Sequence, residues 1–180
     1  MTLNHLIDSH CHIVFSTFQD DLDEVAARWR EAGVKSLVHA CVKPSEIPEI
    51  RKLADRFPEL RYSVGVHPLD IKHWKEGETI DILRSAALDD SRVVAIGELG
   101  LDLYKDSNLD EQVAALKPQL ELAFDLDLPV IVHCREAASP MLELLEDLRN
   151  VGSLVRGVMH CWGGNLEAVS YTHLTLPTKA

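Results

Sequence analysis

The sequence predicts an α/β fold, namely a TIM-type (β/α)₈ barrel of which this chain supplies about six βα units. Short apolar runs alternate with amphipathic stretches six times, which is typical of parallel strands covered by helices. Polar residues follow the first, third, fourth, fifth and sixth runs. An open sheet gathers ligands at one crevice served by few strands, whereas a barrel brings every strand end to one mouth. A complete barrel typically needs about 250 residues, so the 180 residues here account for only part of one.

The apolar runs are the expected strands. The first begins at Leu6 and Ile7 and leads into a polar stretch, and the others cover residues 36–40, 60–66, 93–97, 129–132 and 154–159. Glu98, His133 and His160 each come directly after one of the later runs. Because parallel strands in a barrel end at one mouth, we expect these three side chains to lie close together there.

Amphipathic segments between these runs are the expected helices. Apolar residues recur at helical spacing in residues 20–32, 45–57, 79–88, 110–126 and 139–148. A sixth helix is expected to begin near Asn165 and to break up after Ala168. Pro118 lies inside the fourth of these segments, so we expect that helix to kink or restart there.

The polar stretch after the first run, residues 8–12, is the strongest local signal of a site. Side chains alternate along a strand, so Asp8, His10 and His12 share one face. Two imidazoles on one face can hold a single Zn, Fe, Mn or Ni ion. The same alternation turns Cys11 to the opposite face, and we expect Cys11, Cys134 and Cys161 to be small buried apolar residues rather than ligands.

Charge and cysteine usage narrow the class of protein. The formal net charge of −11 excludes a broad basic surface that tracks phosphates, although it allows a nucleic acid held locally by metal ions. The four cysteines form no C-x-x-C pair, no signal peptide precedes the first strand, and no apolar run is long enough to span a bilayer. We therefore expect a cytoplasmic protein that makes no membrane contact.

The five residues expected to bind metal follow the ends of apolar runs: His10, His12, Glu98, His133 and His160. A carboxylate can bridge two cations, whereas a neutral imidazole cannot. We therefore expect His10 and His12 to hold one ion, His133 and His160 to hold a second, and Glu98 to join them as the catalytic carboxylate. Two such ions about 3.5–4 Å apart would clamp the oxygens of a phosphodiester and supply hydroxide near neutral pH.

Five segments in order carry a resemblance to a known family. They are residues 8–12 (DSHCH), 65–68 (GVHP), 96–102 (IGELGLD), 129–135 (PVIVHCR) and 160–164 (HCWGG). On these motifs the chain resembles the TatD family of metal-dependent hydrolases, within the amidohydrolase superfamily. A glutamate after the fourth strand, where related families often use a modified lysine, makes the resemblance specific to TatD-like proteins.

The resemblance implies a (β/α)₈ deoxyribonuclease that depends on two divalent ions, Mg, Zn or Mn, and acts on DNA from the 3′ end of single strands. It places the metal roles on the five residues given above. Arg135 is expected to meet a substrate phosphate, with a surface ion pair as the alternative. His67 is expected to touch substrate or to pack beside the site. Oligomeric state stays open.

Two departures from the family pattern leave alternatives open. The segment HCWGG differs from the more usual HCFSG-like pattern, and a metal-binding aspartate on a later strand has no counterpart in this chain. Residues 170–179 resemble translated sequencing-adapter DNA, so we expect a partial hydrolase domain over 1–168 and a non-native tail over 169–180. For that reason His173 is not expected to be a ligand. The alternatives are an amidohydrolase acting on a small amide or ester, and an inactive metal-binding fragment.

Overall fold

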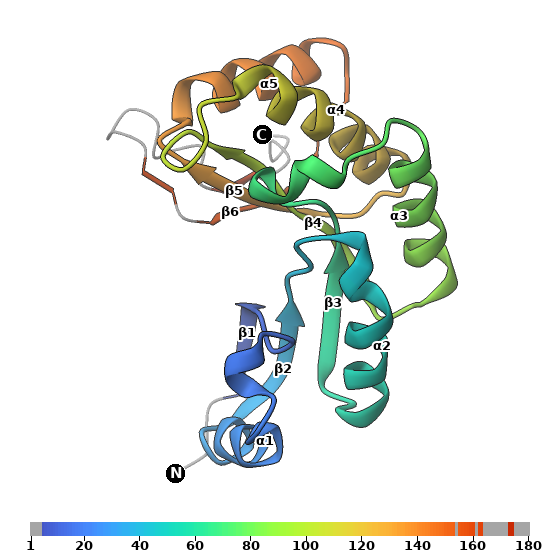
Figure 1. Ribbon diagram of the computed structural model, residues 1–180, viewed down its shortest axis with the longest axis vertical. Coiled ribbons are helices and arrows are strands. Elements are labelled where there is room, and N and C mark those ends of the chain that lie inside the picture. The colour runs from blue at the N-terminus through green and yellow to red at the C-terminus, as the bar shows by residue number, and fades with distance from the viewer. Residues whose placement is uncertain (1–4, 154, 161, 164–172, 175–180) are drawn as a thin grey trace, which may run out of the picture.

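Six parallel strands form one curled sheet, a half-barrel, in the computed structural model (Figure 1). The structure describes residues 5–153, 155–160, 162–163 and 173–174. The strands are β1 (Leu6–Cys11), β2 (Val34–His39), β3 (Leu60–Val64), β4 (Val93–Asp102), β5 (Val130–Arg135) and β6 (Gly157–His160). A short strand, β7 (His173–Leu174), pairs antiparallel with β6.

Neighbouring strands in the sheet follow the order of the chain, from β1 to β6. An open doubly wound sheet would reverse its strand order at a switch point, and this sheet does not reverse among the described strands. The sheet curls as a barrel wall does, with the helices on its outer side (Figure 1). The predicted fold class is therefore confirmed.

Each parallel strand is joined to the next through helical structure, as the amphipathic pattern predicts. The helices are α1 (Leu22–Glu31), α2 (Ile47–Arg56), α3 (Glu78–Asp89), α4 (Leu109–Asp125) and α5 (Ala138–Asn150), with 3₁₀ turns at Ser16–Phe18, Pro44–Glu46 and Pro68–His73. Helix α4 continues through Pro118 as one element, so the expected restart there is wrong. Leu116 and Leu120 on either side of the proline are buried in the core, and this packing holds the helix together.

The core lies beneath the middle of the sheet. Leu60, Tyr62, Ile96 and Val132, from β3, β4 and β5, are fully buried, whereas the first four residues of β1 are exposed. The central strands therefore form the most deeply buried part of the fold, and β4 among them carries Glu98.

β4 is longer than the sequence predicts. The apolar run ends at Gly97, but pairing with β5 continues from Leu99 opposite Val132 to Asp102 opposite Arg135. Gly97 pairs with Ile131, so Glu98 is the extra residue of a β-bulge between two paired positions. Glu98 thus lies inside a strand rather than beyond its end, and the bulge sets the direction of its side chain.

Among the residues that the structure describes, no helix is long and apolar enough to cross a membrane.

Candidate metal centre

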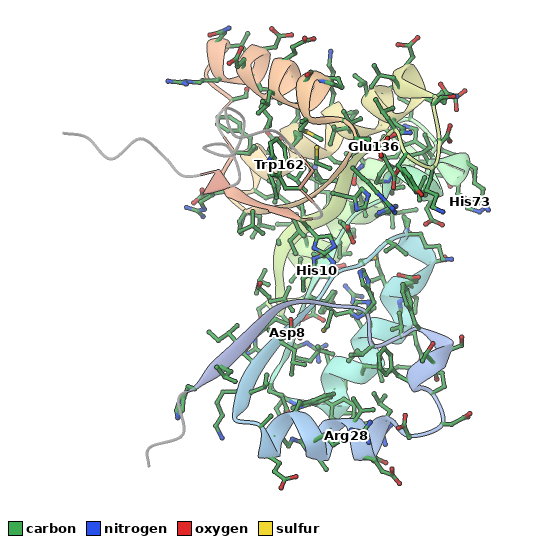
Figure 2. All side chains as sticks on the ribbon, turned by 90° about the vertical axis from the view of Figure 1, so that its left-hand side faces the viewer. Asp8, His10, Arg28, His73, Glu136 and Trp162 are labelled. Carbon is green, nitrogen blue, oxygen red and sulfur yellow. The ribbon has the colours of Figure 1, made fainter. Side chains whose placement is uncertain are left out.

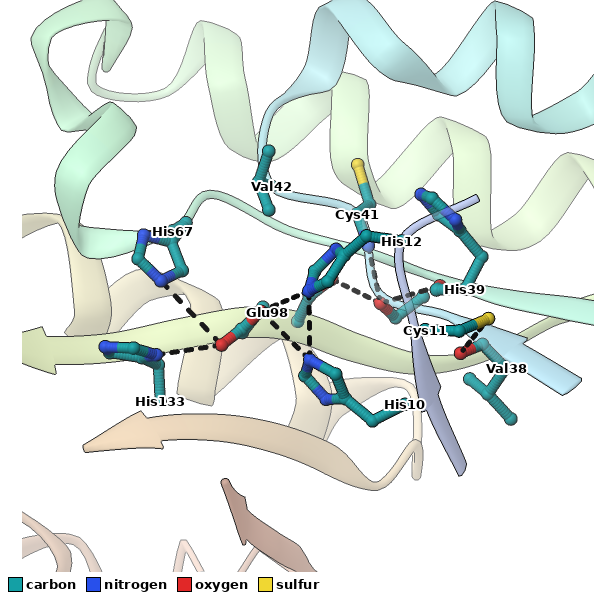
Figure 3. A network of polar contacts seen from close by, with 12 residues as sticks. His10, Cys11, His12, Val38, His39, Cys41, Val42, His67, Glu98 and His133 are labelled. Atoms are coloured by element: carbon teal, nitrogen blue, oxygen red, sulfur yellow. Dashed lines mark hydrogen bonds and ion pairs between the residues drawn. The ribbon is translucent and has the colours of Figure 1, made fainter. Parts of the chain in front are cut away.

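Glu98 is the centre of the polar cluster drawn in Figure 3. Its residue is 2% exposed, and its backbone N–H donates to the carbonyl of Cys41, which follows β2, at 2.7 Å. A buried carboxylate needs partners that offset its lost hydration. Those partners are histidines from β1, from β5 and from the segments after β1 and β3, so the cluster gathers side chains distant in sequence.

The first donor group consists of His10, His12 and Glu98. The Nε2 atoms of the two histidines lie 3.1 Å apart, and they lie 3.3 and 3.4 Å from Oε2 of Glu98. Ligand atoms about 2.1 Å from one ion, at roughly 90–110° to each other, are separated by about 3.0–3.4 Å. The three atoms therefore have the spacing of ligands that share a cation.

The second donor group consists of His67, Glu98 and His133. Nδ1 of His133 lies 2.9 Å and Nε2 of His67 lies 3.7 Å from Oε1 of Glu98, the oxygen that the first group does not use. Burial lowers the pKa of His67 to about 4, so its ring is neutral at pH 7 and has a lone pair to offer. Each oxygen of Glu98 thus faces its own pair of histidines.

The charge of the centre is negative. Burial by itself would raise the pKa of Glu98, but hydrogen bonds from His10, His12 and His133 hold the pKa well below its usual range. Burial also opposes the charge of His133, yet the carboxylates of Glu98 and Asp102 raise the pKa of that imidazole. The carboxylates of Glu98 and Asp102 lie 2.9 and 3.0 Å from the two nitrogens of this one ring, and their negative charge attracts a cation.

Asp102 is a site residue that the sequence analysis quoted within a motif but did not assign. Its Oδ2 lies 3.0 Å from Nε2 of His133, on the opposite side of that ring from Glu98. Its Oδ1 accepts the backbone N–H groups of Tyr104 and Lys105 at 3.0 and 2.8 Å. A carboxylate behind a ligating histidine fixes its orientation. The signal was the even spacing from Glu98 to Asp102, which places both on one face of a strand.

His39 is a second residue that the sequence analysis left without a role. The side chain is fully buried, and its Nδ1 accepts the backbone N–H of Ile13 at 3.1 Å. Burial, together with the neighbouring His12 and His10, lowers the pKa of His39 to about 3. The neutral ring therefore fixes the backbone directly after His12. The only sequence signal was a histidine at the end of an apolar run.

His160 lies in the cluster, but in neither donor group. Its ring stacks on His10, with centroids 3.7 Å apart and planes inclined by 9°, and its centroid lies 6.2 Å from that of His133. Burial, with His10 beside it, lowers the pKa of His160. The structure therefore brings all five expected ligands together but groups His67 with His133. The metal roles themselves stay predictions.

Arg135 lies at the end of β5, two residues beyond His133. Its guanidinium carbon lies 3.9 Å from the ring centroid of Tyr104, which is 51% exposed. The backbone N–H of Leu103 donates to the Arg135 carbonyl, which ties the two strand ends together. The alternative of a surface ion pair is not formed among the described residues. The guanidinium is stacked on its face, so its N–H edge is available to an anion.

A pocket of about 290 Å³ opens above the cluster. It is lined by His12, Phe15, Val42, His67, Leu69, Asp70, Glu98, His133 and His160. Ligand pockets in proteins usually start at about 300 Å³, so this volume suits a small group or one nucleotide unit.

Two of the three cysteines expected to be buried, Cys11 and Cys134, lie in the described part of the chain. Cys134 is buried in the core and Cys11 is partly buried against it, and neither belongs to a donor group. Cys161 lies outside the described residues, and so do most of residues 169–180, including the side chain of His173.

The chain is similar in sequence to proteins of one known family. A family model described as "TatD related DNase" matches residues 7–174. Proteins named 3′-5′ ssDNA/RNA exonuclease TatD are 35% identical over 163 residues in Salmonella typhimurium and in Escherichia coli K12, and 37% identical over 164 residues in a Pantoea species. Each alignment covers 90% of this chain. The chain spans about three fifths of the length of these relatives, 61–62%.

Two crystal structures have the same fold. YJJV, a TatD homologue from Escherichia coli K12, superimposes with a TM-score of 0.82 at 30% identity, over 92% of this chain and 63% of that one. A TatD-like protein from Archaeoglobus fulgidus gives a TM-score of 0.61 at 26% identity, over 92% of this chain and 72% of that one.

Proposed function

The chain belongs to the TatD-related DNase family, and from that premise we propose that its site hydrolyses phosphodiester bonds of single-stranded nucleic acid from the 3′ end with two divalent cations. The family is metal-dependent, and the two donor groups supply candidate ligands. Relatives named as ssDNA/RNA exonucleases support a single-stranded substrate, and we propose DNA ends as the main one.

The single observation that carries the proposal is that the two carboxylate oxygens of Glu98 contact different histidines. Oε2 of Glu98 faces His10 and His12, while Oε1 faces His67 and His133. When a carboxylate bridges two cations, each cation takes one of its oxygens and needs further ligands of its own beside that oxygen. When bound, two divalent ions lower the pKa of a water molecule and neutralise charge on the phosphoryl oxygens.

The residues of this chain position the reactants. Glu98 stays ionised and holds the negative charge that the cations neutralise. Asp102 fixes the His133 ring from behind, so the second donor group keeps its geometry. We propose that Arg135, with its guanidinium face on Tyr104, directs its N–H edge toward a phosphate of the strand.

We propose Mg, Mn or Zn as the cations, with His160 as a further ligand or as support for the stacked His10 ring. Free thiols at Cys11, Cys41 and Cys134 support a reducing, cytoplasmic setting. The division of the chain at residue 168 is tested by sequencing the source locus again from an independent library.

Metal-dependent cleavage of labelled nucleic acid tests the function. The chain is stripped with EDTA, supplied with Mg²⁺, Mn²⁺ or Zn²⁺, and given 5′-labelled single-stranded DNA, duplex DNA and RNA. We expect a ladder that shortens from the 3′ end of single strands and disappears with EDTA or with Glu98→Gln. His73→Ala, an exposed histidine in the 3₁₀ turn after β3 that lies away from His10 (Figure 2), is the matched control and should cleave as the wild type does.

Two other results would contradict the proposal. Hydrolysis of small amides or esters without cleavage of any oligonucleotide would assign the site to another amidohydrolase reaction. Stoichiometric binding of metal without hydrolysis of any substrate would make the chain a metal-binding fragment.

A further inference from the structure

The pocket above the metal centre has an apolar wall that the proposed chemistry does not use. Phe15, Val42 and Leu69 line it together with Glu98 and four histidines. Phe15 is 44% exposed and Leu69 is 38% exposed, although both are large apolar side chains. Exposed apolar surface beside a charged centre is typical of a ligand subsite.

Phe15 is held against His12 by a backbone hydrogen bond and by ring stacking. Its backbone N–H donates to the carbonyl of His12 at 3.3 Å, which turns the chain back over the first donor group. Its ring lies parallel to that of His12, with centroids 4.9 Å apart and planes inclined by 6°. One face of the ring therefore rests on a candidate ligand, and the ring remains nearly half exposed to the pocket.

The charges around this wall favour a neutral group over a phosphate. No lysine or arginine is among the residues that line the pocket, and Asp70 next to Leu69 adds a carboxylate. A second phosphate would be repelled at this end of the pocket, whereas a flat uncharged ring would gain contact. Arg135, the cation expected to meet the strand, is not part of this wall.

We propose that Phe15, with Leu69, forms a stacking subsite for the nucleobase of the nucleotide whose phosphodiester lies at Glu98. This inference rests on the proposed function, because it takes a nucleotide to be the substrate. Stacking on an aromatic ring tolerates every base, since each base has a π face. The subsite therefore holds the terminal nucleotide without selecting its sequence.

Two oligonucleotides test the subsite. One ends in an ordinary 3′ nucleotide, and the other carries an abasic tetrahydrofuran unit at that position. Their dissociation constants are measured by fluorescence anisotropy with Mn²⁺ present and a hydrolysis-resistant phosphorothioate linkage at the 3′ end, so the readout does not depend on turnover. Phe15→Ala should weaken binding of the ordinary strand by about 5- to 100-fold and binding of the abasic strand by less than about twofold. Phe15→Tyr should restore the affinity that Phe15→Ala loses.

Matched variants separate stacking from other effects. Phe124→Ala removes a comparably exposed aromatic ring, 46% exposed on α4, and should bind both strands as the wild type does. The affinity of Phe15→Ala for Mn²⁺, followed by electron paramagnetic resonance, should stay within about twofold of the wild type. A large fall in that affinity would mean that Phe15 serves only to orient His12, and it would overturn the proposal.

The outcomes distinguish this inference from the proposed function. Equal losses on both strands, or no loss on either, would overturn the subsite even if the wild type cleaves DNA. Selective loss on the ordinary strand would support the subsite even if no cleavage occurs. A wild-type chain that binds neither strand would overturn both the subsite and the nuclease assignment.

Discussion

Nδ1 of His133 lies 2.9 Å from Oε1 of Glu98, across the paired strands β5 and β4. The other nitrogen of the same ring lies 3.0 Å from Asp102, four residues beyond Glu98 on β4. The imidazole is thus held between two carboxylates of one strand. Glu98 and His133 of the second donor group therefore lie in buried strands, whereas its third member, His67, comes from the segment after β3.

Removing the charge of Asp102 should weaken the metal centre without abolishing it. Asp102→Asn keeps the size of the side chain but loses the carboxylate that orients His133, and such changes typically cost 10- to 100-fold in metal affinity. Calorimetric titration with Mn²⁺ measures this loss of metal affinity. Asp106→Asn, in the same loop but with no contact to His133 among the described residues, should leave the affinity unchanged. Equal affinities for Asp102→Asn and the wild type would contradict the assigned role.

Replacing Glu98 should change the number of ions bound. Glu98→Gln keeps one oxygen but loses the charge and the second ligand atom, so we expect fewer than two Mn²⁺ ions per chain and at least about 100-fold slower cleavage. Equilibrium dialysis with elemental analysis gives the stoichiometry. Glu143→Gln, exposed on α5, serves as the control. An unchanged stoichiometry in Glu98→Gln would show that this carboxylate does not bridge.

A methyl group at Gly100 on β4 should push away the neighbouring strand β5 and so disrupt the pairing of the two strands. Gly100 has φ +146°, and a Cβ there would overlap the carbonyl oxygen of His133. We expect Gly100→Ala to lower the free energy of unfolding by about 2 kcal/mol or more and to weaken metal binding. Gly77→Ala, also at positive φ but with nothing within 4 Å, isolates the backbone strain and should cost about 1 kcal/mol. Urea unfolding compares the two, and equal costs would contradict the overlap.

Acid should weaken the contact between α1 and the start of β3. Burial opposes the charge of Glu59, but hydrogen bonds from Arg30 (2.6 Å) and Trp29 (2.9 Å) lower its pKa from 4.5 to about 2. Because the folded pKa lies below the unfolded one, this stability is complete above pH 4.5 and is lost as the pH falls toward 2. Glu59→Gln should therefore cost about 1–2 kcal/mol at pH 7 and progressively less in acid.

Urea unfolding at several pH values checks the behaviour of Glu59. Glu49→Gln is the control, because Glu49 pairs with Lys52 on an exposed helix face and should matter little at any pH. A deficit of Glu59→Gln that stays constant down to pH 2 would contradict the assigned linkage.

Salt should reveal whether Arg135 meets a phosphate. Each phosphate contact to a single strand adds about 0.7 to the slope of log K against log salt. Arg135→Ala should therefore weaken binding of single-stranded DNA and reduce the slope by about 0.7, while Arg149→Ala on the outer helix α5 should change neither. Weaker binding with an unchanged slope would mean that Arg135 acts only by supporting Tyr104.

The order of elements was predictable because apolar periodicity is a local property. Each expected strand, and each expected helix up to residue 148, is present with ends shifted by a few residues, and the helix expected near Asn165 lies outside the described residues. The bulge at Glu98 was not predictable, since it arises from pairing between β4 and β5 and leaves no mark in the apolar pattern. The sequence therefore indicated the right carboxylate but placed it beyond the strand.

The grouping of ligands depends on distances between segments far apart in sequence. His10 and His12 are two residues apart, so their shared role followed from strand alternation. His67 could be identified as a site residue, but its position beside Glu98 rather than farther out depends on the curl of the sheet. The stacking of His160 on His10 likewise depends on how β6 approaches β1. Phe15 had no local signal, because an exposed aromatic ring is unremarkable in a sequence.

Asp102 contacts both the His133 ring and the loop that follows β4. One of its oxygens contacts His133, and the other accepts two backbone N–H groups of the loop that carries Tyr104. Any ligand that orders this loop also reduces the conformational entropy lost when the His133 ring is fixed. Thermodynamic reciprocity then requires a cation at His133 to strengthen binding of that ligand by the same factor. We therefore expect a cation at His133 and a strand bound at this loop to strengthen each other's binding.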